Sequence, residues 1–436
     1  MAGIELTALP HREAIEYFRS KGFAPQLQRF HHLDHFREEH ARNFVVAKGM
    51  QDDVLQAIRA ELDAALSEGR TLAQFQTDLK PRLQQLGWWG KSIERDPLTG
   101  EMQEVQLGSM RRLRTIFDTN MRTAHAAGHW ARIQRTKRAF PYLEYVQIER
   151  PTKRHDHARF HGLIRPVDDP IWQRIYPPNG WFCGCTVIQR TEGQLKRAGK
   201  EVSPPLDLNE VLWTNKRTGE VSQLPSGVHP GFDTNPGAVW LDLGEDWDRM
   251  TPDLTPERRA KEKGVIEGLR LRRLNDGRET LVITDANSEP TIMRNADPAR
   301  PNVVSLDGLD IPPTPSFLHS HVSETPLSFK DIETLLDAQG HAITAISPSG
   351  SIWRAVRGTE PVRLPVAEFV QRALSHWDRF ASIDPTEGIT LYQHAMMQWL
   401  ERRGVLTYSY GMSERNRQLV ARYADLMRSL TDDRAI

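Results

Sequence analysis

The sequence predicts an α+β fold with a helical N-terminal region, a small α+β core and a separate C-terminal α+β domain with a helical tail. Helical periodicity dominates residues 10–138, whereas short segments that alternate like strands occur at 142–149 and again from 279. The 436 residues also exceed what one typical hydrophobic core accommodates. We therefore expect several folding units.

Five segments follow from these patterns. Residues 191–250 are rich in Pro, Gly, Asp and Asn and show little periodicity, which is typical of an extended arm. The predicted segments are a helical N-terminal region at 1–108, a small α+β core at 109–190, an extended Pro/Gly-rich arm at 191–263, an α+β domain at 264–360 and a helical tail at 361–436.

Composition excludes some classes of function. Lys plus Arg equals Asp plus Glu at 57 each, so net charge gives no support for bulk attraction to DNA or to an anionic membrane. We find neither a secretory signal nor a run of 18 apolar residues, which indicates synthesis in a cytoplasm and no membrane partner. The two cysteines, Cys183 and Cys185, are too close in sequence for an ordinary structural disulfide. They act as free thiols, soft metal ligands or both.

The N-terminal region is expected to be helical. Pro10 opens a helix that carries Ile15 and Phe18 on one face, and Gly22 ends it. A second helix is predicted to run from 36 to 66. Its apolar stripe consists of Phe36, Phe44, Val54, Leu55, Ile58, Leu62 and Leu66.

A third helix is predicted from Thr71, a suitable N-cap, to Leu86, with Gly87 as its terminator. Pro81 should kink or split it. A turn at 96–100 and a strand at 101–107 follow.

A long basic helix is predicted over 109–138. Its cations form either a solvated helix face or a surface for DNA or an acidic partner. They are Arg111, Arg112, Arg114, Arg122, Arg132, Arg135, Lys137 and Arg138.

The C-terminal half mixes short strands and helices. The predicted strands are Leu269–Leu274, Glu279–Thr284, Asn302–Leu306, Ala342–Ile346 and Ile352–Val356, and the predicted helices are 328–336, 366–377 and 387–431.

Three histidines and the two cysteines are concentrated in about thirty residues. His155, His157 and His161 precede Cys183 and Cys185, and this set of ligands suits zinc. The turn-forming residues Pro177, Pro178 and Gly180 would return the cysteines toward the histidines. The spacing fits no standard zinc finger, so a small core with buried thiols and a structural histidine remains the alternative.

This stretch resembles the phage Mu protein F family of head-morphogenesis proteins. Residues 229–237 look like the Pro-Gly-Phe-Asp-Tyr-Asn-Pro-Gly element that often follows in this family, and the resemblance covers roughly residues 10–240. One departure is Gly184, where the family usually has Arg; Arg190 and Arg154 are candidates to replace its contacts. The residues that carry the resemblance are Lys153, Arg154, His157, Gly162, Asp168, Asp169, Trp172, Pro177, Pro178, Asn179, Cys183 and Cys185.

The resemblance implies a minor capsid or head-morphogenesis protein of a Mu-like bacteriophage. Such a protein is a few-copy component of the virion head, associated with the portal vertex and made in the host cytoplasm during assembly. It would act in prohead assembly and in DNA packaging, retention or delivery. The implied partners are the portal protein, the major capsid or scaffold protein, and phage DNA.

A second constellation lies in the C-terminal half. His319 and His321 are predicted on one strand face, and Ser328 caps a helix whose first turn carries Asp331. This pattern looks like the zinc motif of JAB/MPN metallopeptidases. Six residues instead of seven separate His321 from Ser328, and Val322 stands where the family has Pro.

The general base of that resembled family would be a glutamate on an upstream strand, for which Glu279 and Glu289 are candidates. An intact metal-dependent hydrolase or toxin-like domain, a bound metal without turnover and a purely structural module all remain open. Elsewhere the sequence contains no Gly-rich phosphate loop, nucleophile elbow or obvious catalytic carboxylate pair. The sequence therefore favours a binding role over enzymatic activity, with zinc as the metal to test.

Overall fold

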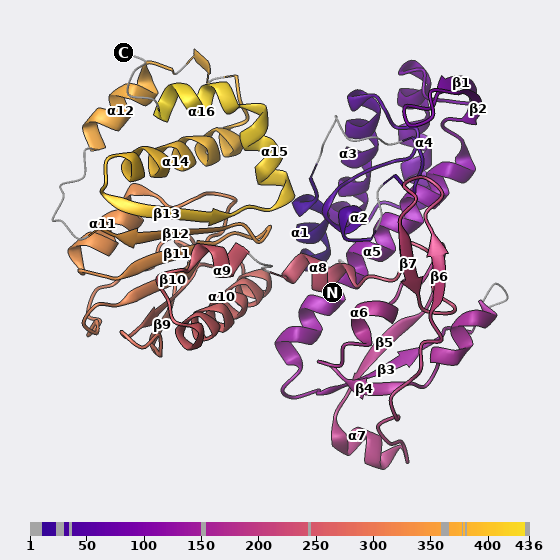
Figure 1. The fold of residues 1–436 in the computed structure, drawn as a ribbon, viewed down its shortest axis with the longest axis horizontal. Helices are drawn as coiled ribbons and strands as arrows, with labels where there is room; N and C mark the ends of the chain where they lie inside the picture. The colour runs from indigo at the N-terminus through magenta and orange to yellow at the C-terminus, as the bar shows by residue number, and fades with distance from the viewer. Residues whose placement is uncertain are drawn as a thin grey trace, which may run out of the picture. The chain divides into compact units, whose positions relative to one another are not determined.

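The computed structural model describes residues 11–22, 30–34, 37–149, 154–242, 246–358, 366–376, 378–379 and 382–431. Pro10, Phe36 and Lys153, which belong to predicted patterns, lie outside the described residues. The chain divides into two compact units, unit 1 at residues 1–240 and unit 2 at 241–436 (Figure 1). Both units mix helices with strands, which confirms the predicted α+β class.

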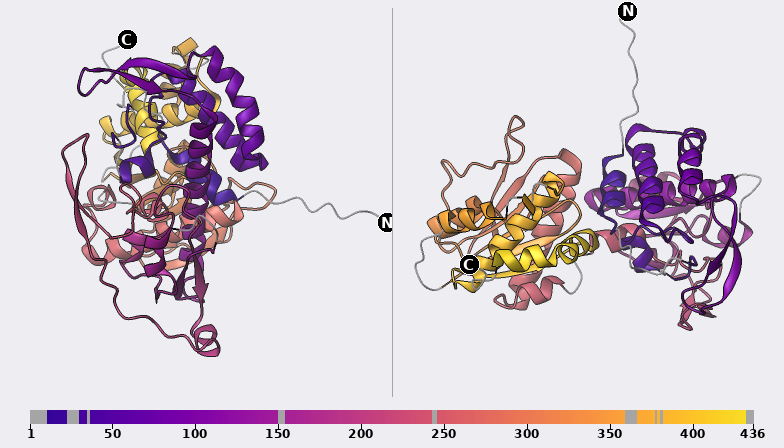
Figure 2. Two further views of the ribbon diagram at one scale, coloured as in Figure 1. Left: turned by 90° about the vertical axis from the view of Figure 1, so that its right-hand side faces the viewer. Right: turned by 90° about the horizontal axis from the view of Figure 1, so that it is seen from above.

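Five helices form the first part of unit 1, and α5 is the long helix that runs through it (Figures 1 and 2). The predicted continuous helix over 36–66 is wrong, because residues 43–51 separate two helices. The chain is extended here because its backbone pairs with Gly22: the Gly22 N–H donates to the Arg42 carbonyl and the Phe44 N–H donates to the Gly22 carbonyl. The helices are α1 (Arg12–Ser20), α2 (Glu38–Arg42), α3 (Asp52–Glu68), α4 (Leu72–Gln85) and α5 (Met110–Thr136).

The capping prediction for α4 is confirmed. The Thr71 side chain accepts from the Gln74 N–H, and the Gln74 side chain accepts from the Thr71 N–H, which completes a capping box. Pro81 lies inside this helix without splitting it, so the prediction of a split is wrong. Its ring is on the exposed side, where it displaces no core side chain.

A glycine allows α1 to cross α5 closely. A Cβ on Gly128 would lie 2.8 Å from the Ala14 backbone nitrogen. The buried Glu13 of α1 pairs with two arginines of α5, at 2.7 Å from Arg135 and 3.2 Å from Arg132. Burial opposes ionisation of Glu13, but these arginines outweigh it, so the pKa of this carboxyl is lowered. Close backbone packing and the ion pairs of the buried Glu13 thus both hold α1 against α5.

A three-stranded antiparallel sheet completes unit 1, with β3 between β4 and β5. The predicted strand is confirmed, but its predicted half-buried alternation is wrong, because Glu144 is buried along with Leu143 and Tyr145. A separate hairpin pairs β1 with β2 across the predicted turn. The strands are β1 (Lys91–Arg95), β2 (Met102–Gln106), β3 (Tyr142–Val146), β4 (Ile164–Pro166) and β5 (Thr186–Arg190), with the short helices η1 (His155–Phe160) and α6 (Trp172–Ile175) between β3 and β5.

The predicted extended arm at 191–263 is wrong in part, because much of it is regular structure. Arg217, in the loop of the β6–β7 hairpin, pairs with Asp34 at 2.7 Å and with Asp96 at 2.5 Å. Such long-range contacts hold this Pro/Gly-rich segment in a defined structure, which the local periodicity of the sequence does not indicate. The elements are α7 (Glu192–Arg197), β6 (Val211–Thr214), β7 (Val221–Leu224), α8 (Pro236–Leu241), α9 (Asp246–Met250) and the start of α10 (Pro256–Asp276).

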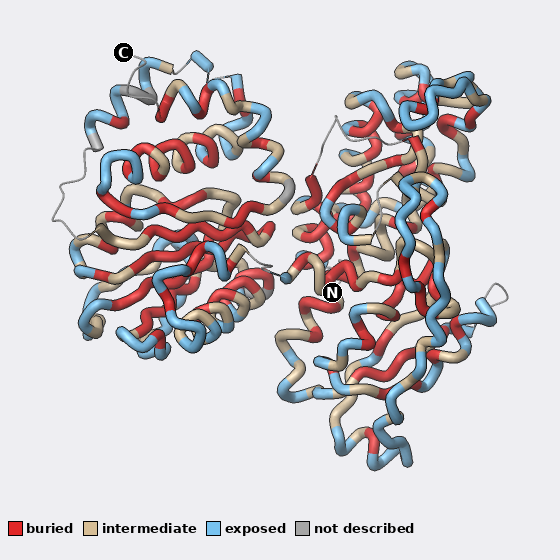
Figure 3. The backbone as a smooth tube through the Cα atoms, in the orientation of Figure 1, coloured by how far each residue is buried: buried red, intermediate tan, exposed pale blue. Residues whose placement is uncertain are grey.

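Unit 2 is built on one six-stranded sheet of order β13-β12-β11-β10-β8-β9. β10 and β11 are parallel, and the remaining neighbours are antiparallel. Its strands are largely buried in Figure 3. They are β8 (Thr280–Thr284), β9 (Pro290–Asn295), β10 (Ser316–Ser320), β11 (Ala342–Ile346), β12 (Ile352–Arg357) and β13 (Leu406–Gly411).

Helices cover both faces of this sheet. Val282 and Leu318 pack against α9 and α10 on one face, whereas their strand neighbours Leu281 and Phe317 join the core with the C-terminal helices on the other. This alternation is what a sheet buried on both sides requires. The helices on the second face are α11 (Phe329–Asp337), α12 (Val366–Leu374), α14 (Pro385–Arg402), α15 (Glu414–Arg422) and α16 (Ala424–Thr431).

Several C-terminal predictions need correction. The predicted strand 269–274 lies inside α10, whose Thr255 cap and αL Gly277 define a continuous helix. The predicted strand 302–306 is irregular. Residues 361–436 are not a purely helical tail, because β13 pairs with β12 along its whole length. The strands at 280–284, 342–346 and 352–357 and the helix that Ser328 caps are confirmed.

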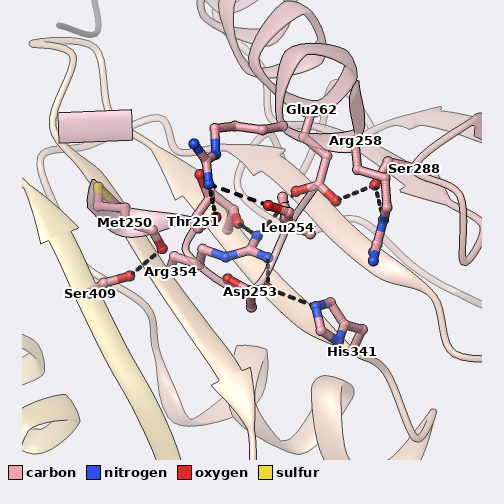
Figure 4. A network of polar contacts seen from close by, with 12 residues as sticks. Met250, Thr251, Asp253, Leu254, Arg258, Glu262, Ser288, His341, Arg354 and Ser409 are labelled. Atoms are coloured by element: carbon pink, nitrogen blue, oxygen red, sulfur yellow. Dashed lines mark hydrogen bonds and ion pairs between the residues drawn. The ribbon is translucent and has the colours of Figure 1, made fainter. Parts of the chain in front are cut away.

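Buried charges join α10 to the sheet. Arg354 of β12 donates to Glu262 of α10 and to Asp253, which in turn contacts His341 at 2.7 Å (Figure 4). The Arg354 and Glu262 side chains are both 0% exposed.

Among the described residues, no helix combines the length and the apolar character needed to cross a membrane.

Candidate functional site

The first candidate site of unit 1 joins η1 to the loop before β5. His157, in η1, is buried, and its Nδ1 lies 3.5 Å from the Sγ of both Cys183 and Cys185. The loop turns at the cis Pro177–Pro178 bond and again where the Cys183 N–H donates to the Gly180 carbonyl. The structure therefore brings together one predicted imidazole and both predicted thiols.

The other two histidines of the predicted zinc set do not join this cluster. His155 and His161 are exposed, and His161 Nδ1 accepts from the Gln147 N–H at 3.1 Å. Of the two histidines in η1, only His157 is buried. Of the five residues expected to form a metal site, the structure gathers three.

Electrostatics at the cluster favour a thiolate. The hydrogen bond from Cys185, followed by that from His157, lowers the pKa of Cys183 to about 4 despite its burial. Tyr145, on the central strand β3, lies beside both thiols, and burial followed by the charge of the thiols raises the pKa of its hydroxyl well above 10.0. Sequence reasoning did not single out Tyr145. The only signal was its inward position in the alternating 142–149 segment.

The remaining motif residues build the frame around this cluster. Arg154 Nη2 donates to the Trp181 carbonyl at 2.9 Å, and Trp172, fully buried, donates its indole N–H to the Pro166 carbonyl. Gly162 has φ of 81°, a conformation that favours glycine, and its N–H donates to the Tyr145 carbonyl. These residues position the turn and the loop rather than offering free groups to a ligand.

The residues proposed to replace the family's Arg are engaged elsewhere. Arg190 pairs with Glu144 at 2.8 Å, and Arg154 holds the Trp181 carbonyl. Gly184 itself borders an open pocket of about 750 Å³ that Cys183 and Cys185 also line. His125, His129, Arg122, Arg132 and Tyr176 are among the other residues around this pocket.

The second motif element, residues 229–237, packs directly onto the first. The His229 N–H donates to the Asn179 carbonyl, and the Asn235 N–H donates to the Gln173 carbonyl. Asp233 is buried and pairs with Arg37 at 2.7 Å. A Cβ on Gly237 would lie 2.4 Å from the Cβ of Trp130, so only glycine allows this approach to α5. The two motif elements are therefore parts of one structural core.

Most of the cations predicted along α5 have partners within unit 1. Arg132 and Arg135 pair with Glu13, and Arg112 donates to three backbone carbonyls. Arg122 pairs with Asp118, and Lys137 pairs with Asp168. Arg111, Arg114 and Arg138 are exposed.

The second candidate site lies in unit 2, where β10 meets α11. His319 lies on β10 and His321 directly after it, and their Nε2 atoms are 2.8 Å apart. Asp331 Oδ1 lies 3.4 Å from His319 Nε2, while its Oδ2 accepts from the N–H and the hydroxyl of Ser328. His321 Nδ1 contacts the Thr325 carbonyl at 2.7 Å, which orients Nε2 toward the cluster. All three predicted ligands therefore converge despite the altered spacing.

The structure separates the two candidate glutamates. Leu281 of β8 pairs with His319, so Glu279 lies opposite His321 just beyond the paired residues. Burial and the nearby charge of Asp331 raise the pKa of Glu279 to about 8, and its carboxylate accepts from the Val322 N–H. Glu289, by contrast, is in an exposed turn and pairs with Lys261 at 2.8 Å. Only Glu279 faces the cluster.

The region around the first site is similar to known proteins. The family model described as Phage Mu protein F like protein matches residues 56–188, within unit 1. The chain is 42% identical over 250 residues to a protein named for capsid assembly, protein F of Escherichia phage Mu; these residues make up 56% of this chain and 53% of the relative. It is 39% identical over 185 residues to the Mu-like prophage FluMu F protein of Haemophilus influenzae, which covers 42% of this chain and 44% of that relative.

The chain spans about half the length of the curated relatives it matches. No solved structure matches it. The matched residues include His157, Cys183 and Cys185 and the sheet that positions them. On these similarities, residues 56–188 in the first half of the chain are similar to the Mu protein F-like proteins of phages.

Proposed function

We propose that this chain is a minor capsid-assembly protein of a Mu-like phage head, which acts in prohead assembly at the portal vertex and in DNA packaging or delivery. The observation that carries the proposal is the 42% identity over 250 residues to a phage Mu protein named for capsid assembly. The packing of the two motif elements, the His157–Cys185 region and residues 229–237, into one core supports the proposal, because both elements then belong to one folded unit.

A binding role also fits the chemistry of unit 1. Its motif residues Arg154, Trp172 and Asn235 hold backbone groups, as parts of a rigid scaffold do. The partners we propose are the portal protein and the major capsid or scaffold protein. Only three of the cations predicted for the helix over 109–138 are exposed, so we do not propose a sequence-independent DNA-binding surface there.

The test is a phage or prophage in which the gene for this chain carries an early stop codon. Without the full-length chain we expect aberrant or empty heads, and supplying the unmodified chain in trans should restore normal ones. Quantitative mass spectrometry of proheads and mature particles should then find the chain in a few copies per particle. Normal heads assembled without the chain, together with its absence from particles, would refute the proposal.

A second candidate function concerns unit 2: a metal-dependent hydrolase. The observation that favours it is the convergence of His319, His321 and Asp331, with Glu279 opposite them. This donor set fits zinc, since imidazole nitrogen and carboxylate oxygen are both zinc ligands. A zinc ion held there would polarise a carbonyl group and activate water. Glu279, whose carboxylate faces the cluster, would hold the proton taken from that water.

This second function is tested in the full chain with Cys183→Ser and Cys185→Ser, so that only the unit 2 cluster remains. We expect one zinc per chain, lost on His319→Ala or Asp331→Ala, and slow cleavage of unstructured peptides. Glu279→Gln should keep the metal and abolish cleavage, whereas the matched Glu289→Gln should change neither. Absence of zinc, or cleavage that persists in Glu279→Gln, would eliminate the hydrolase.

A further inference from the structure

The cluster of His157, Cys183 and Cys185 has the dimensions of a metal site. Zn–S distances of about 2.3 Å and Zn–N distances of about 2.0–2.1 Å give a tetrahedral site an S···N edge of about 3.5 Å. The two S···N distances here are both 3.5 Å. All three ligand atoms lie within 4.8 Å of one another.

The chemistry of these donors selects the ion. Two thiolates and one imidazole form a soft ligand set that zinc prefers, whereas calcium and magnesium require oxygen. Cys183 and His157 are each 2% exposed, so their side chains are already withdrawn from water.

We propose that His157 Nδ1 and the thiolates of Cys183 and Cys185 bind one zinc ion, with a water from the adjoining pocket as its fourth ligand. The pocket beside Gly184 reaches both cysteines, so solvent has access to the fourth position.

The ion would cross-link two segments of unit 1, η1 and the loop before β5. His157 precedes Cys183 by 26 residues and Cys185 by 28, and the β4 strand and α6 lie between them. Because the site forms only in the folded chain, binding zinc stabilises the fold. This role is independent of whether the chain assembles capsids.

The first measurement counts metal and thiols in the full chain with His319→Ala and His321→Ala, purified under reducing conditions. These substitutions remove the unit 2 cluster, so any bound zinc reports on unit 1. We expect one zinc per chain. The chain has only 2 cysteines, so alkylation counts the site directly: zinc should protect both thiols, and chelation should expose both.

The second measurement identifies the ligands. Cobalt in place of zinc should give a thiolate-to-metal charge-transfer band, which Cys183→Ser and Cys185→Ser each weaken and the double variant abolishes. His157→Ala should also lose the ion, whereas the exposed neighbours tested by His155→Ala and His161→Ala should retain it. Chelation should lower the melting temperature of unit 1 by at least about 4 °C.

The proposal is overturned if the reduced chain binds no zinc after loading, or if the double cysteine variant binds as much as the parent. If the variants fail to fold, alkylation of the parent chain with and without zinc still tests the proposal. Equal labelling of both thiols in the two conditions would reject the site. A capsid-assembly defect without loss of zinc would leave it intact.

Discussion

Arg354 and Glu262 form an ion pair with both side chains fully buried, at a distance of 3.1 Å between Nη1 and Oε2. The same guanidinium donates to Asp253 at 2.8 Å and to the Thr344 hydroxyl at 3.0 Å. Breaking a buried pair leaves an uncompensated charge, which costs more than the pair itself contributes. One residue of β12 thus secures α10 and the preceding turn against the sheet.

Arg354→Met should therefore destabilise unit 2 by about 3–5 kcal/mol, because Glu262 and Asp253 both lose the guanidinium that compensates their charge. Hydrogen exchange of β11 and β12 peptides measures the loss. Lys330→Ala, which removes an exposed pair with Glu333, is the matched control and should change stability by less than about 0.5 kcal/mol. Equal effects of the two substitutions would contradict this account.

Lys21 predicts a pH dependence of unit 1. Burial lowers the pKa of this lysine from 10.5 to about 7, with the charge of Arg59 as a smaller cause. The unfolded chain therefore holds the proton more tightly than the folded chain, so stability should rise as pH increases from about 7 toward 10. Below pH 7 both states are charged and the penalty is complete.

Lys21→Met should then stabilise unit 1 at pH 7 by a few kcal/mol, on the order expected for removing a buried charge, and flatten the rise. Urea unfolding at pH 6 and pH 9, followed by pulsed proteolysis of unit 1, provides the measurement. Lys80→Met, at an exposed position of α4, should leave the profile unchanged. A parent chain with the same stability at both pH values would exclude this effect of Lys21.

Gly128→Ala should loosen the crossing of α1 and α5. The added Cβ would meet backbone at 2.8 Å, and overpacking of this kind costs about 1–3 kcal/mol. Gly268→Ala in α10 is the opposite case, because a Cβ at this position would have open space for 4 Å around it. That substitution should stabilise unit 2 by about 0.5–1 kcal/mol. Calorimetry of both variants checks the opposite signs.

Arg217→Ala should release the β6–β7 hairpin from Asp34 and Asp96. The pKa of Asp96 is lowered to about 2, first by its hydrogen bond with Arg217, so the carboxylate is charged and would lose its partner at neutral pH. Limited proteolysis should cut 215–220 faster in the variant. Arg217→Lys should recover only part of the protection, since an ammonium cannot replace both forked contacts. Unchanged cleavage in Arg217→Ala would contradict this assignment.

The sequence by itself determined the elements whose signals are local. The Thr71 capping box, the Ser328 cap and the strand β3 all depend on neighbouring residues, and the structure has them where the pattern predicts. The resemblance carried by His157, Trp172 and the Cys-x-Cys pair could likewise be recognised from the sequence, because it depends on the spacing of residues along the chain. The histidines, cysteines and aspartate of both candidate sites stand out in the sequence for the same reason, although it does not show which histidines meet the cysteines.

Only the tertiary structure decided what depends on distant partners. It selected His157 over His155 and His161, and Glu279 over Glu289, because burial and strand register determine which side chains meet. It added β13 to a tail of helical character, since pairing with β12 outweighs local preference. It also ordered the Pro/Gly-rich segment through Arg217 and Asn235, whose partners lie far away in the sequence. Contacts between distant residues, unlike periodicity, leave no mark in a single sequence.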